Sequence, residues 1–389
     1  MSKKQFFEGF SKLSRDEKLK MLAETMNDPD AFISELNGYR FQDGPLQQEF
    51  EQFSENTISN FHLPYGIAPN FLIDGKVYHV PMVTEESLVI AAASKASKFW
   101  YHNGGFQTEE IDTAKRGHVH FLWHGEPDEL ESLFKEFEQG IKEKLTDVTR
   151  DMDARGGGIN ETWVTDMTSE MDHYYLLGLS LETVNSIGAD FINSVLEKTA
   201  QEFKKFADNQ HPGKLEIIMA ILSNYTPGSY VKMKVECPVE AFQDFDQSLN
   251  GVQFAEKFKK AVQIGDHSVS RAVTNNKGIM NGIDAVAIAT GNDFRALEAA
   301  AHAFSITRGK PTSLTKCEIE NNTFTFQIKI PLALGTVGGV TQLHPLAAKS
   351  LEILNQPDAK ELMKITAAVG LASNFSAITS LITTDIQNK

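Results

Sequence analysis

One segment constrains this chain more than any other. It runs from Arg271 to Glu298 and reads RAVTNNKGIMNGIDAVAIATGNDFRALE. Polar residues surround Lys277 near its start, and Gly278 and Gly282 interrupt any regular element there. Glycine also lets the backbone come close to a bound group, because it has no side chain. We therefore predict a polar loop that carries Lys277.

The second half of the segment supplies a possible partner for this lysine. An apolar run, residues 283–289, leads through a polar turn, residues 290–293, into an Ala-rich helix expected from Phe294 to about Phe304. A buried ammonium needs a carboxylate partner. Lys277 and Asp293, on the two sides of the apolar run, are therefore a candidate reactive pair. The alternative is a surface lysine and an aspartate that caps a helix.

Composition limits the class of protein. The 389 residues are 41% apolar, which suffices for a sizeable core in two modest domains or one interrupted domain. A net charge of −15 argues against a nucleic-acid partner and against an anionic membrane surface. Cys237 and Cys317 lack a metal-type spacing, so we expect free thiols and no metal site. The charged N-terminus has no signal-peptide core, and no apolar run is expected to reach membrane-spanning length. A soluble cytoplasmic protein follows.

The first part of the chain reads as helices followed by a hairpin. Residues 1–58 have helical apolar spacing, with a capping-box pattern at residues 14–17. The alternating segment from Phe71 to Val80 has Asp74-Gly75 at its middle, which predicts a hairpin. Glu85 and Glu86 then precede an apolar helix, where two carboxylates suit the helix dipole.

The middle of the chain predicts a separate small domain. After the turn-rich residues 103–106, the pattern changes to strands and amphipathic helices. A strand, residues 174–181, meets the turn at residues 185–190, which opens a helix expected to end near Asp208. A strand, a glycine turn and a helix N-terminus form a generic anion site. The spacing is not the Rossmann GxGxxG. We expect residues 215–224 to return the chain to the larger body.

The block NKGIMNGIDAVAIATGND nearly copies the signature of class II 3-hydroxy-3-methylglutaryl-CoA (HMG-CoA) reductases, and the resemblance extends from Gln48 to Asn374. It implies an α+β fold in which a large, helix-rich mixed domain is interrupted by a small ferredoxin-like, non-Rossmann dinucleotide-binding domain. The implied boundaries are 1–108 and 215–375 for the large domain, 109–214 for the small domain, and 376–389 for the start of a C-terminal flap domain.

The resemblance also implies an activity. Enzymes of this family reduce (S)-HMG-CoA to mevalonate and CoA with two NADPH or NADH, or run the reverse reaction, in the mevalonate pathway of isoprenoid synthesis. The implied assembly is a homodimer with its active site at the subunit interface. A catalytically weakened CoA-ester-binding relative is the alternative reading.

Five residues match the family's catalytic and substrate-binding positions. Lys277 would stabilise the oxyanion that forms at the thioester carbonyl, and Asp293 would hold Lys277 and hydrogen-bond Glu86. Glu86 would protonate the oxygen of mevaldehyde. Arg271 would contact the acyl-CoA, and Asn281 would help to hold Lys277. All these roles come from the resemblance.

The family binds its nicotinamide dinucleotide at the turn that here spans residues 185–190. The corresponding cofactor-binding residues are Asn185, Gly188, Ala189, Asp190 and Asn193. The turn departs from the family pattern, since an acid is usual at Asn185 and an asparagine at Asp190. A negative Asp190 near a pyrophosphate would be unfavourable unless it points away.

Other positions also depart from the pattern. Residues 86–88 read Glu-Ser-Leu where the family has Glu-Pro-Ser, and Asn275 replaces a usual histidine. The family continues from the position of Lys389 into a flap domain whose histidine protonates the CoA thiolate. The resemblance therefore predicts that this chain is a truncated form.

Overall fold

The computed structural model describes residues 7–383, and these form two compact units that divide after Pro64. The first unit is helical, as expected. Its elements are a 3-10 helix, η1 (Phe10–Lys12), α1 (Arg15–Ala23), α2 (Pro29–Gly38) and α3 (Gly44–Glu51). The predicted capping box is present: the Ser14 side chain accepts from the Glu17 N–H, and the Glu17 carboxylate accepts from the Ser14 N–H. The helix therefore begins where its sequence satisfies the free backbone donors.

The second unit begins with the predicted hairpin, β1 (Tyr65–Ile73) and β2 (Lys76–Val83). Asp74 and Gly75 have φ of 46° and 81°, the left-handed conformation that a two-residue hairpin turn requires. A four-stranded antiparallel sheet of the large domain has the order β11-β12-β8-β3. Its strands are β3 (Gln107–Thr113), β8 (Ser229–Pro238), β11 (Thr315–Glu320) and β12 (Thr323–Pro331). Two short strands, β9 (Ile306–Thr307) and β10 (Lys310–Pro311), pair separately.

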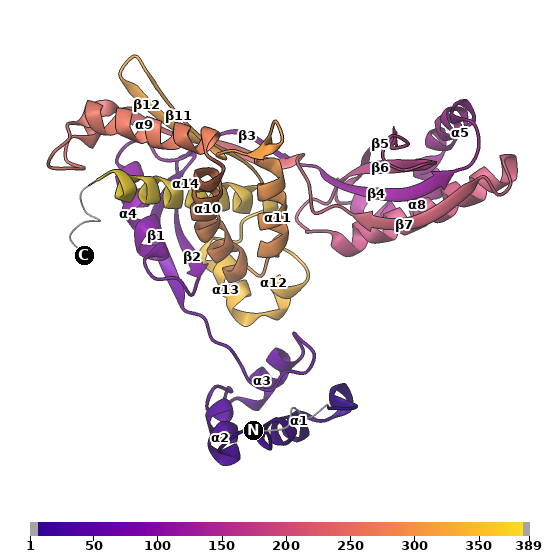
Figure 1. Cartoon of the computed structure of the whole chain (residues 1–389), viewed down its shortest axis with the longest axis horizontal. Helices are drawn as coiled ribbons and strands as arrows, with labels where there is room; N and C mark the ends of the chain where they lie inside the picture. Colours follow the sequence, from indigo (N-terminus) through magenta and orange to yellow (C-terminus); the bar gives the residue numbers. More distant parts are fainter. Residues whose placement is uncertain (1–6, 384–389) are drawn as a thin grey trace. The chain divides into compact units, whose positions relative to one another are not determined.

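Helices pack around these strands to form one large core (Figure 1). They are α4 (Val89–Tyr101), η2 (Val239–Phe242), α9 (Gly251–His267), α10 (Val269–Ala289), α11 (Phe294–Phe304), α12 (Val340–Leu343), α13 (Pro345–Ile353) and α14 (Ala359–Ile382). The predicted helix from Phe294 to Phe304 is confirmed. Cys237 and Cys317 lie in the large sheet as buried free thiols, as expected.

The region around Lys277 differs from the prediction. Lys277 lies on a continuous helix, α10, and the predicted polar loop is wrong. Each glycine costs a helix only about 1 kcal/mol, and here the helix regains that cost by close packing on α14. A side chain at Gly282 would lie 2.4 Å from the Ser373 Oγ, and one at Gly370 would lie 2.9 Å from Ile283. These glycines therefore permit contact between helices rather than a turn.

Helix α14 also corrects an expectation. Residues 359–382 are long and apolar enough to cross a membrane by length and composition, although no such run was expected from the sequence. In the structure 78% of its apolar window is buried within the protein. It packs against α10 and α4 as the central helix of the large core. The expected boundary at residues 375–376 falls inside this helix, and residues 384–389 lie outside the part that the structure describes.

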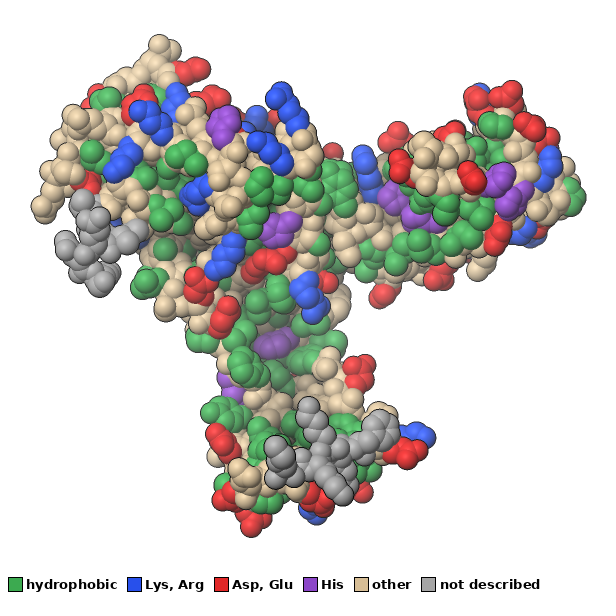
Figure 2. Space-filling view, viewed as in Figure 1, with side chains coloured by type: hydrophobic (Ala, Val, Ile, Leu, Met, Phe, Trp, Pro, Cys, Tyr) green, Lys and Arg blue, Asp and Glu red, His purple; other side chains and the backbone are tan. Residues whose placement is uncertain are grey.

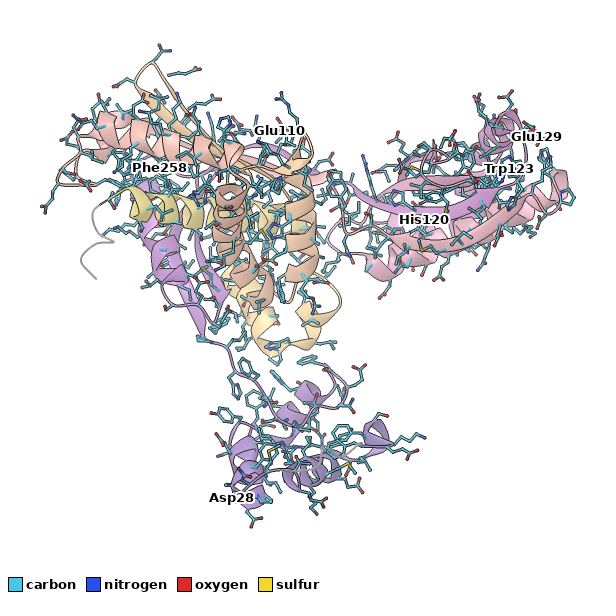
Figure 3. All side chains as sticks on the ribbon, in the orientation of Figure 1. Asp28, Glu110, His120, Trp123, Glu129 and Phe258 are labelled. Atoms are coloured by element: carbon cyan, nitrogen blue, oxygen red, sulfur yellow. The ribbon has the colours of Figure 1, made fainter. Side chains whose placement is uncertain are left out.

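The small domain has the expected ferredoxin-like order β5-β6-β4-β7, with helices on one face and a core of its own (Figures 1 and 3). Figure 3 labels Trp123 within this domain and Phe258 within the large domain. The elements are β4 (Lys115–Trp123), α5 (Pro127–Gln139), α6 (Ile141–Lys144), α7 (Thr146–Asp153), β5 (Gly158–Asp166), β6 (Tyr174–Glu182), α8 (Ala189–Gln210) and β7 (Leu215–Leu222).

The boundaries of the small domain need correction. Residues 107–113 form β3 and pair with β8 of the large sheet, so the small domain begins after residue 113 rather than at 109. Residues 215–222 form β7 and pair with β4. The chain therefore returns to the large domain after residue 222, not after 214, because a non-local pairing retains this strand in the small sheet.

Candidate active site

Lys277 and Glu86 form an ion pair. The Lys277 Nζ donates to the Glu86 Oε2 over 2.5 Å, although the two residues are 191 positions apart in the chain. Helix α10 supplies the lysine, and the segment between β2 and α4 supplies the glutamate, whose N–H is held by the Thr84 hydroxyl. The side chains remain 57% and 47% exposed. An ion pair this exposed to solvent adds little to the stability of the fold. Because of the same exposure, both charged groups are accessible to a ligand.

A third carboxyl group faces this pair. Asp284 lies two helical turns after Lys277, and its Oδ1 is buried without a hydrogen-bond partner among residues 7–383. Burial raises the pKa of Asp284 to about 8, with further contributions from Glu298 and Glu85, while Lys277 opposes the shift. The Asp284 carboxyl group is therefore largely protonated at neutral pH and stores a proton beside the ion pair.

Asp293 lies at the start of α11 and not beside the Lys277–Glu86 ion pair. It caps α11, and its Oδ1 accepts from the N–H groups of Arg295 and Ala296. The helix from Lys277 to Ala289 alone spans about 18 Å at 1.5 Å per residue. A lysine side chain does not reach that far, so Asp293 and Lys277 of one chain do not form the expected pair.

The two expected substrate-binding residues lie near Lys277 on α10. Asn281 follows Lys277 by four residues, so the two share one side of the helix. Arg271 lies in the first turn, where its guanidinium donates to the Asn275 Oδ1 over 3.3 Å, and burial lowers its pKa. Asn275 itself is buried and hydrogen-bonded to Ser313 and Asn374. It therefore supports the helix instead of facing a ligand.

A cavity of about 330 Å³ lies where the small domain meets the large domain. Asp293 lines it from the large domain, and Ala189 and Asn193 line it from helix α8. Three of the residues expected for catalysis or cofactor binding are thus brought together. The Asn193 Oδ1 also accepts from the Leu222 N–H, which fixes α8 against β7.

The expected cofactor turn joins β6 to α8, as predicted. Gly188 has φ of 76° at the helix start, and a side chain there would lie 2.5 Å from Thr183. The Asn185 Oδ1 accepts from the Ala359 N–H at the beginning of α14. Asn185 is therefore engaged in joining the turn to the large domain. Asp190 is exposed in the first turn of α8, which leaves it free to point toward solvent.

A lysine that the sequence analysis did not single out also borders the cavity. Lys115, at the start of β4, is 3% exposed. Its ammonium donates to the Thr183 hydroxyl, just before the expected cofactor turn, and to the Ser186 carbonyl within it. Burial lowers its pKa to about 8. Its pattern is that of an ordinary strand residue, so only the non-local pairing of β4 with β6 reveals its position. Asp284 was missed because the i to i+7 relation to Lys277 has meaning only on a helix.

A ferredoxin-like domain with a glycine turn, inserted in a domain that carries a Lys–Glu pair, defines an α+β protein of the non-Rossmann class. Comparison with known proteins specifies the family. The family model for hydroxymethylglutaryl-coenzyme A reductase matches residues 14–389. The chain belongs to this family, whose members are oxidoreductases that act on HMG-CoA.

Individual relatives agree. The chain is 34% identical over 381 residues to the 3-hydroxy-3-methylglutaryl-coenzyme A reductase of Archaeoglobus fulgidus, covering 97% of this chain and 83% of that protein. It is 32% identical over 384 residues to a probable reductase of Borreliella burgdorferi, covering 97% and 84%. The class II reductase of Streptococcus pneumoniae, solved with NADPH in open conformations, superposes with a TM-score of 0.81 at 31% identity, covering 97% of this chain and 100% of that one.

Proposed function

We propose that this chain reduces (S)-HMG-CoA to mevalonate and CoA at a site shared between two copies. One HMG-CoA, two NAD(P)H and two protons give mevalonate, CoA and two NAD(P)⁺. The observation that carries the proposal is the accessible ion pair of Lys277 and Glu86 in a chain of this family. We expect the enzyme to act in the cytoplasm.

Lys277 serves the step in which negative charge develops. Bound NAD(P)H supplies a hydride to the thioester carbonyl carbon, and the carbonyl oxygen becomes an oxyanion. The Lys277 ammonium donates to that oxygen and stabilises it. Glu86, at 2.5 Å, fixes the position of the ammonium. Collapse of the oxyanion would break the C–S bond and release mevaldehyde and the CoA thiolate, which takes up one of the two protons. A second hydride would then add to the mevaldehyde carbonyl carbon, and Glu86 would give the other proton to the mevaldehyde oxygen. Asn281 and Arg271 orient the substrate along the same helix.

A second copy supplies Asp293. Within one chain Asp293 is about a helix length from Lys277, so the expected triad needs a partner's Asp293. Val269 and Val273 precede Lys277 on its side of α10 and are 46% and 48% exposed. Figure 2 shows such apolar side chains between charged ones on the molecular surface. Burial of these valines against a second copy would exclude water from the ion pair.

The residues around the cavity fit a nicotinamide dinucleotide, either NADPH or NADH. Within the described chain, the N–H groups of Ala189, Asp190 and Phe191 have no hydrogen-bond acceptor, and they lie at the positive end of α8. The segment that contains Gly335 also packs tightly against the turn, because a side chain at Gly335 would lie 2.5 Å from the Ile187 N. Free donors at a helix N-terminus suit a pyrophosphate.

Complementation between two inactive chains tests both the lysine and the shared site. We expect Lys277→Ala and Asp293→Asn to lose at least about 100-fold in kcat for HMG-CoA reduction. Both should fold, because Lys277 is exposed and asparagine caps helices as well as aspartate. Co-expressed with two different tags, the purified heterodimer has one intact site of two and should recover about half of the wild-type rate.

Two results would contradict this proposal. Activity retained by Lys277→Ala would exclude the oxyanion role. A heterodimer as inactive as its parents would show that Lys277 and Asp293 do not act across the interface. Mevaldehyde reduction, followed in parallel, distinguishes a weakened relative, since that half-reaction requires no thiolate protonation.

A further inference from the structure

Lys115 is a buried cation without a buried anion. Its side chain is 3% exposed, and within residues 7–383 it has no carboxylate within ion-pair distance. Glu182 is the nearby acid, but its carboxylate accepts from the Thr113 hydroxyl and from the Val184 N–H. The Lys115 ammonium has only the Thr183 hydroxyl and the Ser186 carbonyl. An ammonium has three donors, so one remains without an acceptor.

Such an arrangement costs free energy in the chain as it stands. A desolvated charge that is not neutralised is unfavourable, and the protein responds by favouring the neutral amine. The pKa of Lys115 is accordingly lowered to about 8. A methionine of similar length would fill the same space without this penalty. A ligand that brings negative charge would remove the penalty and restore the ammonium.

The surroundings indicate the charge of that ligand. Lys115 is the basic residue that lines the cavity of about 330 Å³. The turn that holds its ammonium, Thr183 to Ser186, leads directly into the first turn of α8, whose free N–H groups offer further positive potential. The cavity is not basic throughout, because the Asp293 carboxylate also lines it. Positive charge is therefore concentrated at the turn.

We propose that Lys115 binds the diphosphate of the nicotinamide dinucleotide and supplies the charge that this altered turn needs. The inference rests on the proposed function, which requires a dinucleotide at this turn. A diphosphate of two negative charges occupies the space between the Lys115 ammonium and the N–H groups of Ala189 and Asp190. The ammonium would add positive charge at a helix start whose first turn carries the acidic Asp190. Coenzyme A carries the same diphosphate, so the test includes both ligands.

Direct binding measures the effect without turnover. NADPH is titrated into the full chain by its own fluorescence, and CoA by calorimetry. Lys115→Met should weaken NADPH binding about 10- to 100-fold, as expected for one charge-assisted contact. CoA binding and the KM for HMG-CoA should stay within about twofold of wild type, because neither depends on the dinucleotide contact. Lys115→Arg should retain part of the affinity, because it preserves the charge.

A matched lysine controls for structure. Lys204, on α8 of the same domain, also donates to a backbone carbonyl, that of Leu215, but does not line the cavity. Lys204→Met should bind NADPH as wild type does. The melting temperature of Lys115→Met should equal or exceed that of wild type at pH 7, since a buried charge has been removed. A purely structural lysine would instead lower the melting temperature.

Proton uptake gives an independent signature. If a diphosphate neutralises the ammonium, binding raises the Lys115 pKa, and NADPH binding at pH 8.5 takes up protons. Calorimetry in buffers of different ionisation enthalpy detects this uptake, which Lys115→Met should lose. The charged group that acts on the ammonium within the described chain is the Glu182 carboxylate, and Asp293 is the carboxylate that lines the same cavity.

The outcomes separate the two proposals. Unchanged NADPH affinity in Lys115→Met, with wild type active, overturns the inference and leaves the proposed function. A selective loss of CoA affinity also overturns it, because the diphosphate would then be that of coenzyme A. If wild type binds neither NADPH nor NADH, which is titrated in the same way, both proposals are overturned.

Discussion

At the scale of single residues, Asp284 is the most unusual group near the ion pair. Burial among apolar helix contacts, together with the facing Glu298 carboxylate, keeps its carboxyl protonated well above the ordinary range. Lys277, seven residues earlier, opposes this only weakly. Because Asp284 is protonated, it adds no negative charge to that of Glu298 near Lys277. The positive charge of Lys277 is therefore not neutralised by Asp284.

This protonation makes stability depend on pH. The folded chain holds the Asp284 proton to about pH 8, whereas the unfolded chain releases it near pH 4. Folding therefore takes up a proton between these values, and this contribution to stability is lost as pH rises toward 8. Asp284→Asn should match wild type near pH 4 and become more stable than wild type as pH approaches 8. Urea midpoints across this range measure the difference.

An aspartate with the opposite shift is the control. Hydrogen bonds from Lys204 and from the Gly213 N–H lower the pKa of Asp208. Its contribution to stability is present above the unfolded pKa and is lost as pH falls. Asp208→Asn should therefore be less stable than wild type at neutral pH. A pH-independent difference for Asp284→Asn would show that its carboxyl is not protonated in the folded chain.

At the scale of elements, the contact between α10 and α14 separates two glycines of one helix. A side chain at Gly282 would lie 2.4 Å from the Ser373 Oγ and 2.9 Å from the Val369 carbonyl oxygen. At Gly278, one turn earlier, the nearest atoms would be 3.9 Å away. The same substitution should therefore have opposite effects at the two sites.

Gly282→Ala should destabilise the chain by about 1–3 kcal/mol, because the helices must separate. Gly278→Ala should be neutral or stabilise by up to about 1 kcal/mol, since alanine favours the helix and fits the available space. Chemical unfolding of the two variants in parallel measures both. Equal effects in the two variants would mean that helix propensity, and not packing against α14, determines the change in stability.

These glycines also explain where sequence reasoning succeeded and failed. The hairpin at Asp74-Gly75, the helix after Asp293 and the turn before α8 were predictable, because each depends on a local signal. The loop predicted around Lys277 was wrong, because close packing compensates for the low helix propensity of Gly282. That packing is against Ser373, far along the chain. Only the family resemblance indicated that Lys277 and Glu86 belong to one site, because no periodicity relates residues 191 apart, and their direct ion pair was not predicted. The Asp293 role and the substrate contacts remain predictions.

At the scale of the whole molecule, the cofactor turn is the connection between the two domains. The Asn185 Oδ1 accepts from the Ala359 N–H, and its backbone carbonyl accepts from the N–H groups of Thr336 and Val337. Ala359 is 2% exposed, so its N–H has little access to water. Asn185 therefore joins the small domain to the beginning of α14 through its side chain and to residues 336–337 through its carbonyl.

Asn185→Ala should weaken this connection by about 1–3 kcal/mol, the cost of a buried N–H without an acceptor. In a Trp100→Phe background, fluorescence reports only Trp123 and Trp163, both in the small domain. Their thermal transition should move to lower temperature in Asn185→Ala. Asn185→Asp, which retains the acceptor oxygen, should behave as the parent. An unchanged transition in Asn185→Ala would show that the domains are held together by other contacts.

The small domain enters and leaves the large domain at neighbouring points, because its last strand, β7, pairs with its first strand, β4. Gly117 pairs with Leu222, and the Ser223 N–H donates to the Arg116 carbonyl, so the first and last strands of the small domain begin and end side by side. Its roughly hundred residues thus form a cassette with adjacent ends, which could be joined to the large domain of a related chain at two neighbouring positions. If the small domain binds the dinucleotide as proposed, exchange of this cassette between related chains would transfer cofactor preference as a block and leave the large domain unchanged.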